Sequence, residues 1–265
     1  MTYAEMRSNA KSNLNGSCRV CPVCDGRACA GEVPGMGGKG TASSFTANVS
    51  SLASVKLNMR LIHSAAKPDM SLTMFGKRMS LPVFAAPVSG TTLNMGGKFS
   101  EAEYISWIIK GCHDSSVFPM VGDTAIEQFL TDNLAELKKA GGEGIAIIKP
   151  WENESVIAKM RLAEEAGAFA VGMDIDAAGL VTLSLHGKGV SSKPLKDLRE
   201  IRAATKLPFI LKGIMTVEDA LAAVDAGVDA VVVSNHGGRV LDGTPGVAEA
   251  LPAIAAACKG KIILL

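Results

Sequence analysis

Polar side chains follow directly on an apolar run near the C-terminal end of the chain. Residues 230–233 read AVVV, and Ser234, Asn235 and His236 come next. Three consecutive valines favour a strand buried on both faces, as in a parallel sheet under helices. The imidazole of His236 titrates near neutral pH, so at a strand end it is suited to accept a proton. Arg239, three residues on, offers a planar fork for a carboxylate.

Two glycines follow this histidine. Gly237 and Gly238 let the backbone turn tightly and approach a ligand closely. A lone histidine in a loop more often only satisfies backbone groups, but here it stands among residues suited to chemistry. We therefore expect a catalytic site at the end of this strand.

The stretch SNHGGRVLDGTP at residues 234–245 closely resembles the signature of the FMN-dependent α-hydroxy acid dehydrogenase and oxidase family, which includes glycolate and lactate oxidases. LPVFAAPVSG at residues 81–90 resembles the first strand of the family's barrel, and LPFILKGIMTVEDA at residues 207–220 resembles the fifth. The resemblance runs from about residue 58 to the C-terminus. We expect a Cys- and Gly-rich leader at residues 1–57 and an FMN-dependent barrel at residues 58–265.

The resemblance implies an enzyme that oxidises a 2-hydroxy acid or a related alcohol to the oxo product. His236 would take a proton from the substrate while hydride equivalents pass to flavin N5. Asp174 would pair with His236 and orient it, although Asp176 competes for this role. Lys212 would stabilise the negative charge that develops on the reduced flavin.

The resemblance also assigns binding residues. Arg239, with help from Lys149, would hold the substrate's acidic group. This chain departs from the family at Ile147 and Lys149, where a flavin-binding glutamine and a substrate-binding tyrosine are usual, and it lacks the arginine that follows the fourth strand. These departures leave the specificity for small 2-hydroxy acids open. The residues expected to contact FMN are Ala86, Pro87, Val88, Lys212, Ser234 and His236.

Apolar runs alternate with helical periodicity after about residue 80, which predicts parallel strands joined by helices. Helices are expected at residues 154–166 and 217–226, with Gly167 and Gly227 in their C-terminal caps. The pattern favours a TIM (β/α)₈ barrel over a doubly wound open sheet. The seven expected strands are residues 81–87, 117–121, 144–149, 168–175, 208–212, 230–234 and 261–265.

Seven strands leave this barrel one unit short, and we expect a C-terminally incomplete barrel. In the family, the loops after strands seven and eight hold the flavin phosphate, in line with the usual phosphate site of this fold. The sequence stops at Leu265, within the seventh strand. Weak retention of FMN is therefore expected.

Four cysteines in the leader, Cys18, Cys21, Cys24 and Cys29, have the spacing C-x₂-C-x₂-C-x₄-C. Four thiolates this close together could hold zinc or an iron–sulfur cluster. The spacing matches neither a standard zinc finger nor a standard ferredoxin, so free or redox-active thiols are the alternative. The glycine-rich residues 31–44 read as a flexible linker or lid.

Bulk composition bounds the remaining possibilities. The chain has 265 residues, 48% of them hydrophobic and 20% charged, so it can bury one sizeable core. Its net charge of +1 lacks the basic excess of a nucleic-acid-binding protein. No apolar run reaches the ~20 residues of a membrane span, and no signal peptide is evident. A cytoplasmic protein is expected, and the resemblance implies a homo-oligomer, a tetramer. Two other functions stay open: a flavoprotein like type 2 isopentenyl-diphosphate isomerase, and a non-catalytic truncated barrel with a metal-binding leader.

Overall fold

The strands expected from the sequence form one parallel sheet in the computed structural model, which describes residues 1–187 and 189–265. All seven expected strands are confirmed. The first is shorter than expected, because only two of its residues pair with the next strand and the flanking Pro82 and Pro87 have no N–H to donate. The strands are β3 (Phe84–Ala85), β4 (Phe118–Gly122), β5 (Ile145–Ile148), β6 (Ala170–Asp174), β7 (Phe209–Ile214), β8 (Ala230–Val233) and β9 (Ile263–Leu264).

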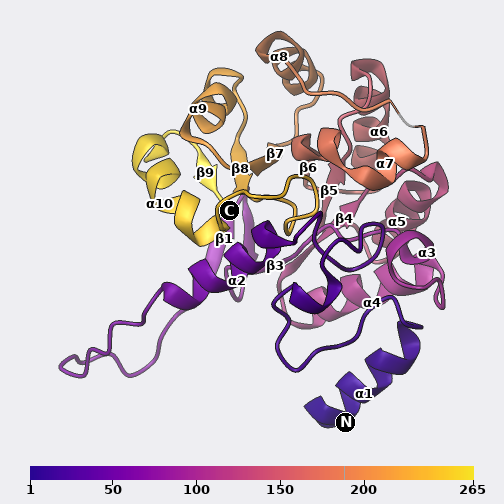
Figure 1. Ribbon diagram of the computed structural model, residues 1–265. Helices are drawn as coiled ribbons and strands as arrows, with labels where there is room; N and C mark the ends of the chain where they lie inside the picture. Colours follow the sequence, from indigo (N-terminus) through magenta and orange to yellow (C-terminus); the bar gives the residue numbers. More distant parts are fainter. Residues whose placement is uncertain (188) are drawn as a thin grey trace.

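The order of the strands identifies the architecture. Neighbours in the sheet are neighbours in the chain, from β3 to β9, whereas a doubly wound sheet reverses its order partway. The fold is therefore TIM-barrel-like. Figure 1 shows the crossover helices in an arc outside the strands. Within the described residues β3 and β9 each pair with one strand only, so the sheet is open. The crossover helices are α4 (Glu101–Asp114), α5 (Glu127–Lys139), α6 (Asn153–Glu165), α8 (Leu195–Ala203), α9 (Val217–Asp225) and α10 (Val247–Cys258).

Local signals in the sequence start and end these helices. Ser100 and Glu103 form a capping box at the start of α4, and the Thr216 side chain accepts a hydrogen bond from the first turn of α9. Gly167 follows α6 with φ +88°, and Gly227 follows α9 with φ +77°. Both expected helices and both expected caps are confirmed.

Alternate residues of each strand enter two different cores. Val121, Val171 and Val231 pack between the sheet and the helices. Their neighbours along the strands, including Met120 and Ala230, pack on the other face of the sheet, inside the curl. Period-two alternation therefore fills both faces with apolar side chains, as a parallel sheet requires.

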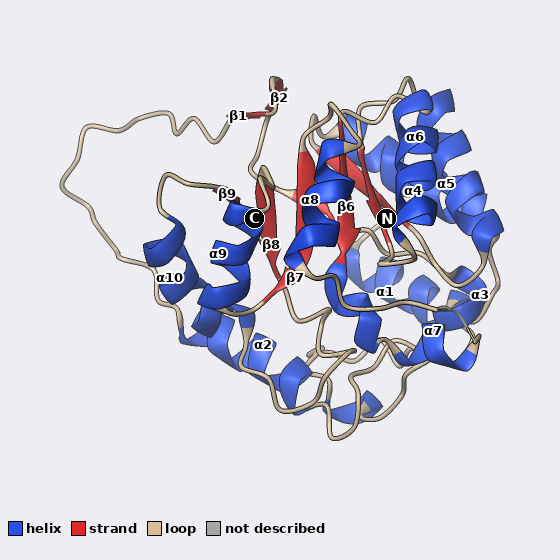
Figure 2. Cartoon of the chain, turned by 90° about the horizontal axis from the view of Figure 1, so that it is seen from above, coloured by secondary structure: helices blue, strands red, loops and turns tan. Residues whose placement is uncertain are grey.

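An antiparallel hairpin that the sequence did not predict adds to the inner core. It consists of β1 (Leu72–Met74) and β2 (Lys77–Met79). Met74 and Met79 are buried, and Met74 packs against the inner strand residues. The hairpin lies at the end of the sheet opposite the leader helices (Figure 2), so the carboxyl ends of the strands stay free for a site.

The leader is fastened to the loop after β8. It contains α1 (Tyr3–Asn13) and α2 (Ser43–Ser54). The backbone N–H of Lys39 donates to the Gly238 carbonyl (2.9 Å), and the side chains of Asn48 and Asn235 exchange hydrogen bonds of 2.8 and 3.1 Å. Residues 31–44 were expected as a flexible linker or lid. The expectation of a free linker is wrong, because this stretch is bonded to the loop after β8 and two of its residues, Gly35 and Met36, line the cavity described below.

Residues 55–71 leave the body of the protein as a long exposed segment between α2 and the hairpin (Figure 1). Leu57 and Ile62 are 97% and 94% exposed. Among the described helices, none is both long and apolar enough to cross a bilayer.

Candidate functional site

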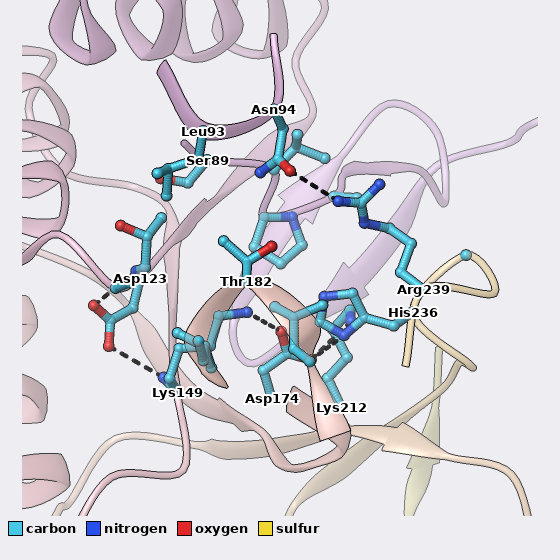
Figure 3. A pocket seen from close by; sticks show the side chains of 18 of the residues that line it. Ser89, Leu93, Asn94, Asp123, Lys149, Asp174, Thr182, Lys212, His236 and Arg239 are labelled. Atoms are coloured by element: carbon cyan, nitrogen blue, oxygen red, sulfur yellow. Dashed lines mark hydrogen bonds and ion pairs between the residues drawn. The ribbon is translucent and has the colours of Figure 1, made fainter. Parts of the chain in front are cut away.

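A cavity of about 360 Å³ lies at the carboxyl ends of the strands (Figure 3). Strands β3 to β8 each end at it, and the leader contributes Gly35 and Met36 to its wall. Every site residue predicted outside the cysteine cluster lines this cavity: Ala86, Pro87, Val88, Lys149, Asp174, Lys212, Ser234, His236 and Arg239. The rule that functional residues follow the strands of such a fold explains this convergence.

His236 stands at the centre of the polar side chains. Its backbone φ is +58°, which is uncommon for a residue other than glycine. The Ser234 hydroxyl accepts the backbone N–H of His236 at 3.1 Å. Nδ1 of His236 lies 2.8 Å from Oδ1 of Asp176 and 3.5 Å from Oδ1 of Asp174. The structure therefore gives the hydrogen bond to Asp176, the residue expected only as a competitor, and brings Asp174 into contact as well.

Asp174 is an acceptor for two ammonium groups. Lys149 Nζ donates to its Oδ2 at 2.7 Å, and Lys212 Nζ donates to its Oδ1 at 2.8 Å. Asp174 and Lys149 are both more than 90% buried. One carboxylate thus holds the two lysines at the floor of the cavity, as the dashed lines in Figure 3 show.

Burial and neighbouring charges shift the pKa values of Asp174 and Asp176 in opposite directions. Burial acts to raise the pKa of Asp174, but the charges of His236, Lys149 and Lys212 outweigh it and hold that pKa well below its usual range. Burial and the neighbouring Asp174 charge raise the pKa of Asp176. Burial lowers the pKa of His236. The imidazole is therefore neutral at neutral pH and free to act as a base.

Gly213 makes room for Asp176. The glycine has φ +103°, and a Cβ there would lie 2.5 Å from Cγ of Asp176. It also marks an irregularity in the pairing of β7 with β8. Asp176 itself lies in the 3₁₀ helix η2 (Ile175–Gly179), which turns back over β7 directly after β6.

Arg239 connects the cavity to the leader. Its Nη1 donates to the carbonyls of Gly35 (2.5 Å) and Gly37 (3.0 Å), and its Nη2 donates to Oδ1 of Asn94 (2.9 Å). A guanidinium has five N–H donors, so two of them, one on Nε and one on Nη2, have no acceptor among the described residues. Nε and Nη2 lie along one edge of the guanidinium, and this is the kind of edge that a carboxylate binds.

The loop after β3 forms an apolar wall of the cavity with Pro87 and Val88. Glu101 of α4, which the sequence analysis missed, holds the far end of this loop: its carboxylate accepts the N–H groups of Gly90 and Thr91. Glu101 is 98% buried, so its position is fixed.

The cavity fits the expected FMN in its chemistry. Apolar side chains such as Leu93 and Leu183 suit a flat aromatic ring, and Lys212 places a cation beside it. The Thr182 hydroxyl, which lines the cavity, is buried and has no hydrogen-bond partner within the described residues. Buried polar groups are normally bonded, so this hydroxyl is suited to a ligand atom.

Asp123 also lines the cavity and was missed, although it directly follows β4 and the strand-end rule would have found it. Its carboxylate accepts bonds from Lys159 Nζ (3.0 Å) and Trp151 Nε1 (2.5 Å). These partners lie behind the cavity wall, so Asp123 holds the wall together.

The four leader cysteines are all free thiols. In the part of the chain that the structure describes, the one group of three or more possible metal ligands within 4.8 Å of one another is Asp174, Asp176 and His236. The expected cysteine site is thus not arranged for a single ion, and Asp174 already pairs with two lysines.

A family model described as FMN-dependent dehydrogenase matches residues 35–183 and 185–265. The chain is 30% identical to 4-hydroxymandelate oxidase of Amycolatopsis orientalis over 84% of this chain and 70% of that protein. It is 29% identical to L-lactate oxidase of Lacticaseibacillus rhamnosus over 82% of this chain and 65% of that protein. The chain therefore spans about two thirds of the length of these relatives.

A crystal structure of mandelate oxidase superposes with a TM-score of 0.75 at 26% identity. The superposition covers 99% of this chain and 78% of that one. The similarity therefore extends through the sheet, the helices and the leader.

Proposed function

Because the chain belongs to the FMN-dependent dehydrogenase family, we propose that it oxidises a 2-hydroxy acid to the oxo acid in the cavity at the strand ends. The observation that carries this proposal is the contact of His236 with Asp176 beside Lys212 and Arg239. This arrangement puts a base (His236), the carboxylate that orients it (Asp176) and two cations (Lys212 and Arg239) around the same cavity.

His236 acts as the base. An ionised Asp176 only accepts hydrogen bonds, so Nδ1 carries the proton and Nε2 is left with a free lone pair. Nε2 then takes the proton from the substrate. Asp176 and Asp174, both in contact with the ring, stabilise the imidazolium that results.

Arg239 binds the carboxylate of the substrate through its two uncommitted N–H groups. Lys149 contributes charge from the floor of the cavity, where Asp174 holds it. With Asp123 and its partner Lys159 included, there are four positive charges (Lys149, Lys159, Lys212 and Arg239) and three negative charges (Asp123, Asp174 and Asp176), a net +1 with His236 neutral. This excess favours an anionic substrate.

Ala86, Pro87, Val88 and Ser234 are proposed to hold FMN, with Lys212 and His236 beside its ring. Bound FMN supplies the acceptor for the hydride equivalent. Lys212 is nearly buried, and the charges of Asp174 and Asp176 outweigh the effect of burial and raise its pKa. It therefore stays cationic and stabilises negative charge next to it.

The test is anaerobic titration of the FMN-loaded chain with 2-hydroxy acids, including lactate, glycolate and mandelate. We expect the flavin absorbance to bleach with at least one acid, and His236→Gln to bind FMN without bleaching. Bleaching by no acid, with FMN bound, would contradict the proposal. The comparisons favour this reading over the isomerase and the non-catalytic barrel, since both reported relatives are named as oxidases.

Three further expectations stay predictions. These are the division into residues 1–57 and 58–265, the tetramer and the cytoplasmic location. Light scattering on the purified chain tests the tetramer, and cell fractionation tests the location.

A further inference from the structure

The segment that carries the four leader cysteines is built from tight turns around sulfur. The backbone N–H of Val20 donates to Sγ of Cys18 at 3.3 Å. Val20 has φ +48°, which is a strained value for a β-branched residue, and Gly26 has φ +83°. Turns of this kind point backbone N–H groups at sulfur, and such bonds tune the potential of iron–sulfur centres.

The four thiols lie close enough to affect one another. Burial raises the pKa of Cys24, and the charges of Cys18 and Cys21 raise it further. Burial likewise raises the pKa of Cys29, followed by the charges of Cys24, Glu32 and Cys18. The four side chains therefore gather in one short stretch of the leader, residues 18–29, and all four are free thiols.

The spacing of the sulfurs separates two kinds of metal centre. Four sulfurs bonded to one tetrahedral zinc at ~2.3 Å lie ~3.8 Å apart. Within the described residues, no three of these cysteines bring their sulfurs within 4.8 Å of one another. A core of several metal ions holds its thiolates further apart than one ion does, so it does not require this single-ion spacing.

Cations surround the segment. Arg7 donates to the carbonyls of Val20 (2.8 Å) and Cys21, and its charge acts to lower the pKa of Cys24. The charge of Arg19 acts in the same direction on Cys29. Arg19 is paired with Glu32 at 2.6 Å, so Arg7 is the guanidinium that would offset part of the negative charge of four bound thiolates.

We propose that Cys18, Cys21, Cys24 and Cys29 ligate one [4Fe–4S] cluster. Each thiol loses its proton and binds one iron of the cluster. The family model matches from residue 35 onwards, so the four cysteines lie outside the matched residues.

The proposed cluster adjoins the wall of the cavity. Cys29 packs so tightly on Gly37 that a Cβ on the glycine would lie 2.0 Å from the Cys29 carbonyl oxygen. The carbonyl of Gly37 in turn accepts a bond from Arg239 (3.0 Å). The cluster therefore also braces the loop that holds this arginine.

The experiment uses the full chain, purified without oxygen and reconstituted with sulfide and equal amounts of ferrous and ferric iron, which together give the 2+ form of the cluster. We expect about four iron and four sulfide per chain, with an electron paramagnetic resonance signal after reduction with dithionite. Iron and sulfide are measured chemically because FMN absorbs in the same region as a cluster. Cys24→Ala is expected to lose most of the iron, and the matched control Cys112→Ala, a buried cysteine of α4, is expected to keep it.

Circular dichroism shows whether each variant is folded, and FMN binding is measured separately. Stoichiometric zinc in place of iron would overturn the proposal. So would a folded wild-type chain that retains no iron, or a folded Cys24→Ala chain that retains all of it. These outcomes leave the oxidation of hydroxy acids untouched, because flavin bleaching tests that activity independently.

Discussion

Asp176 Oδ1 lies 2.8 Å from Nδ1 of His236, closer than any atom of Asp174, although Asp174 ends the strand. The 3₁₀ turn after β6 brings Asp176 back over β7 into the cavity region. The two aspartates therefore divide the work: Asp176 orients the imidazole, and Asp174 neutralises the lysines beneath it.

Substituting each aspartate separately is expected to give different defects. Asp176→Asn removes the anion behind His236, so kcat/KM is expected to fall by ~10²–10⁴ in a folded protein. Asp174→Asn leaves Lys149 and Lys212 without their shared carboxylate, so the free energy of unfolding is expected to fall by ~3–5 kcal/mol. Steady-state kinetics and urea unfolding measure the two effects. Equal loss of stability in both variants would contradict this division.

The pH dependence of kcat/KM reports on His236. The base must be deprotonated, and burial lowers its pKa from 6.5. We expect kcat/KM to stay level as pH falls to about 6.5 and to decline only below that value. The measurement is a pH profile with a slow substrate. An acidic limb with its midpoint above 6.5 would show that another group, or a charged imidazole, controls the reaction.

Replacing Arg239 tests its two free donors. Arg239→Lys keeps the charge but loses the planar fork and its contacts with Gly35, Gly37 and Asn94. We expect KM for the hydroxy acid to rise ~10–100-fold, with a smaller change in kcat. Asn94→Ala, which removes one contact and leaves the guanidinium in place, serves as the control. An unchanged KM in Arg239→Lys would mean that the substrate carboxylate binds elsewhere.

Gly213→Ala tests the positioning of Asp176 without changing any polar group. The added methyl would lie 2.5 Å from Cγ of Asp176, in a backbone region that alanine avoids. Displacing Asp176 is expected to lower kcat by ~10-fold or more. Gly111→Ala in α4, where a Cβ meets nothing within 4 Å, is the matched control and is expected to stabilise the protein by ~0.5–1 kcal/mol. Crystal structures of both variants show whether Asp176 has moved.

Asp242 links leader stability to pH. Its carboxylate accepts the hydroxyl and N–H groups of Ser43 and Thr41, led by the Ser43 hydroxyl, and these bonds lower its pKa. A lowered carboxyl pKa stabilises the fold above the unfolded value of ~3.9, and this contribution is lost as pH falls through the folded value.

Asp242→Asn is therefore expected to melt at a lower temperature than wild type at pH 7. The difference in melting temperature between Asp242→Asn and wild type is expected to become smaller as pH drops below about 4. Asp69→Asn, whose carboxylate bonds only to Ser71 nearby in the chain, serves as the control. If this difference in melting temperature stayed constant down to pH 2, the ionised carboxylate of Asp242 could not be its cause.

The seven strands and two of the crossover helices were predicted from local sequence, and most of the site was predicted from the resemblance to the family. The valine run predicted β8, and the strand-end rule placed Lys212, Asp174 and His236 at strand ends, while the resemblance supplied their pairing and roles. The role of Asp176 was harder to predict. Asp176 lies two residues after Asp174, and the conformation of the turn between them decides which aspartate reaches the imidazole. Arg239 was predicted as an anchor, but its bonds to Gly35 and Gly37 join residues about 200 positions apart, which no local pattern encodes.

The bonds between the leader and the loop after β8 also set an order of events during synthesis. Thr41 and Ser43 bond to Asp242, about 200 residues later in the chain. At ~5–20 residues per second, the ribosome needs on the order of 10–40 s to make the partner. Through that interval the leader has emerged without its anchor, so its cysteines are open to iron delivery and to oxidation before the barrel captures them.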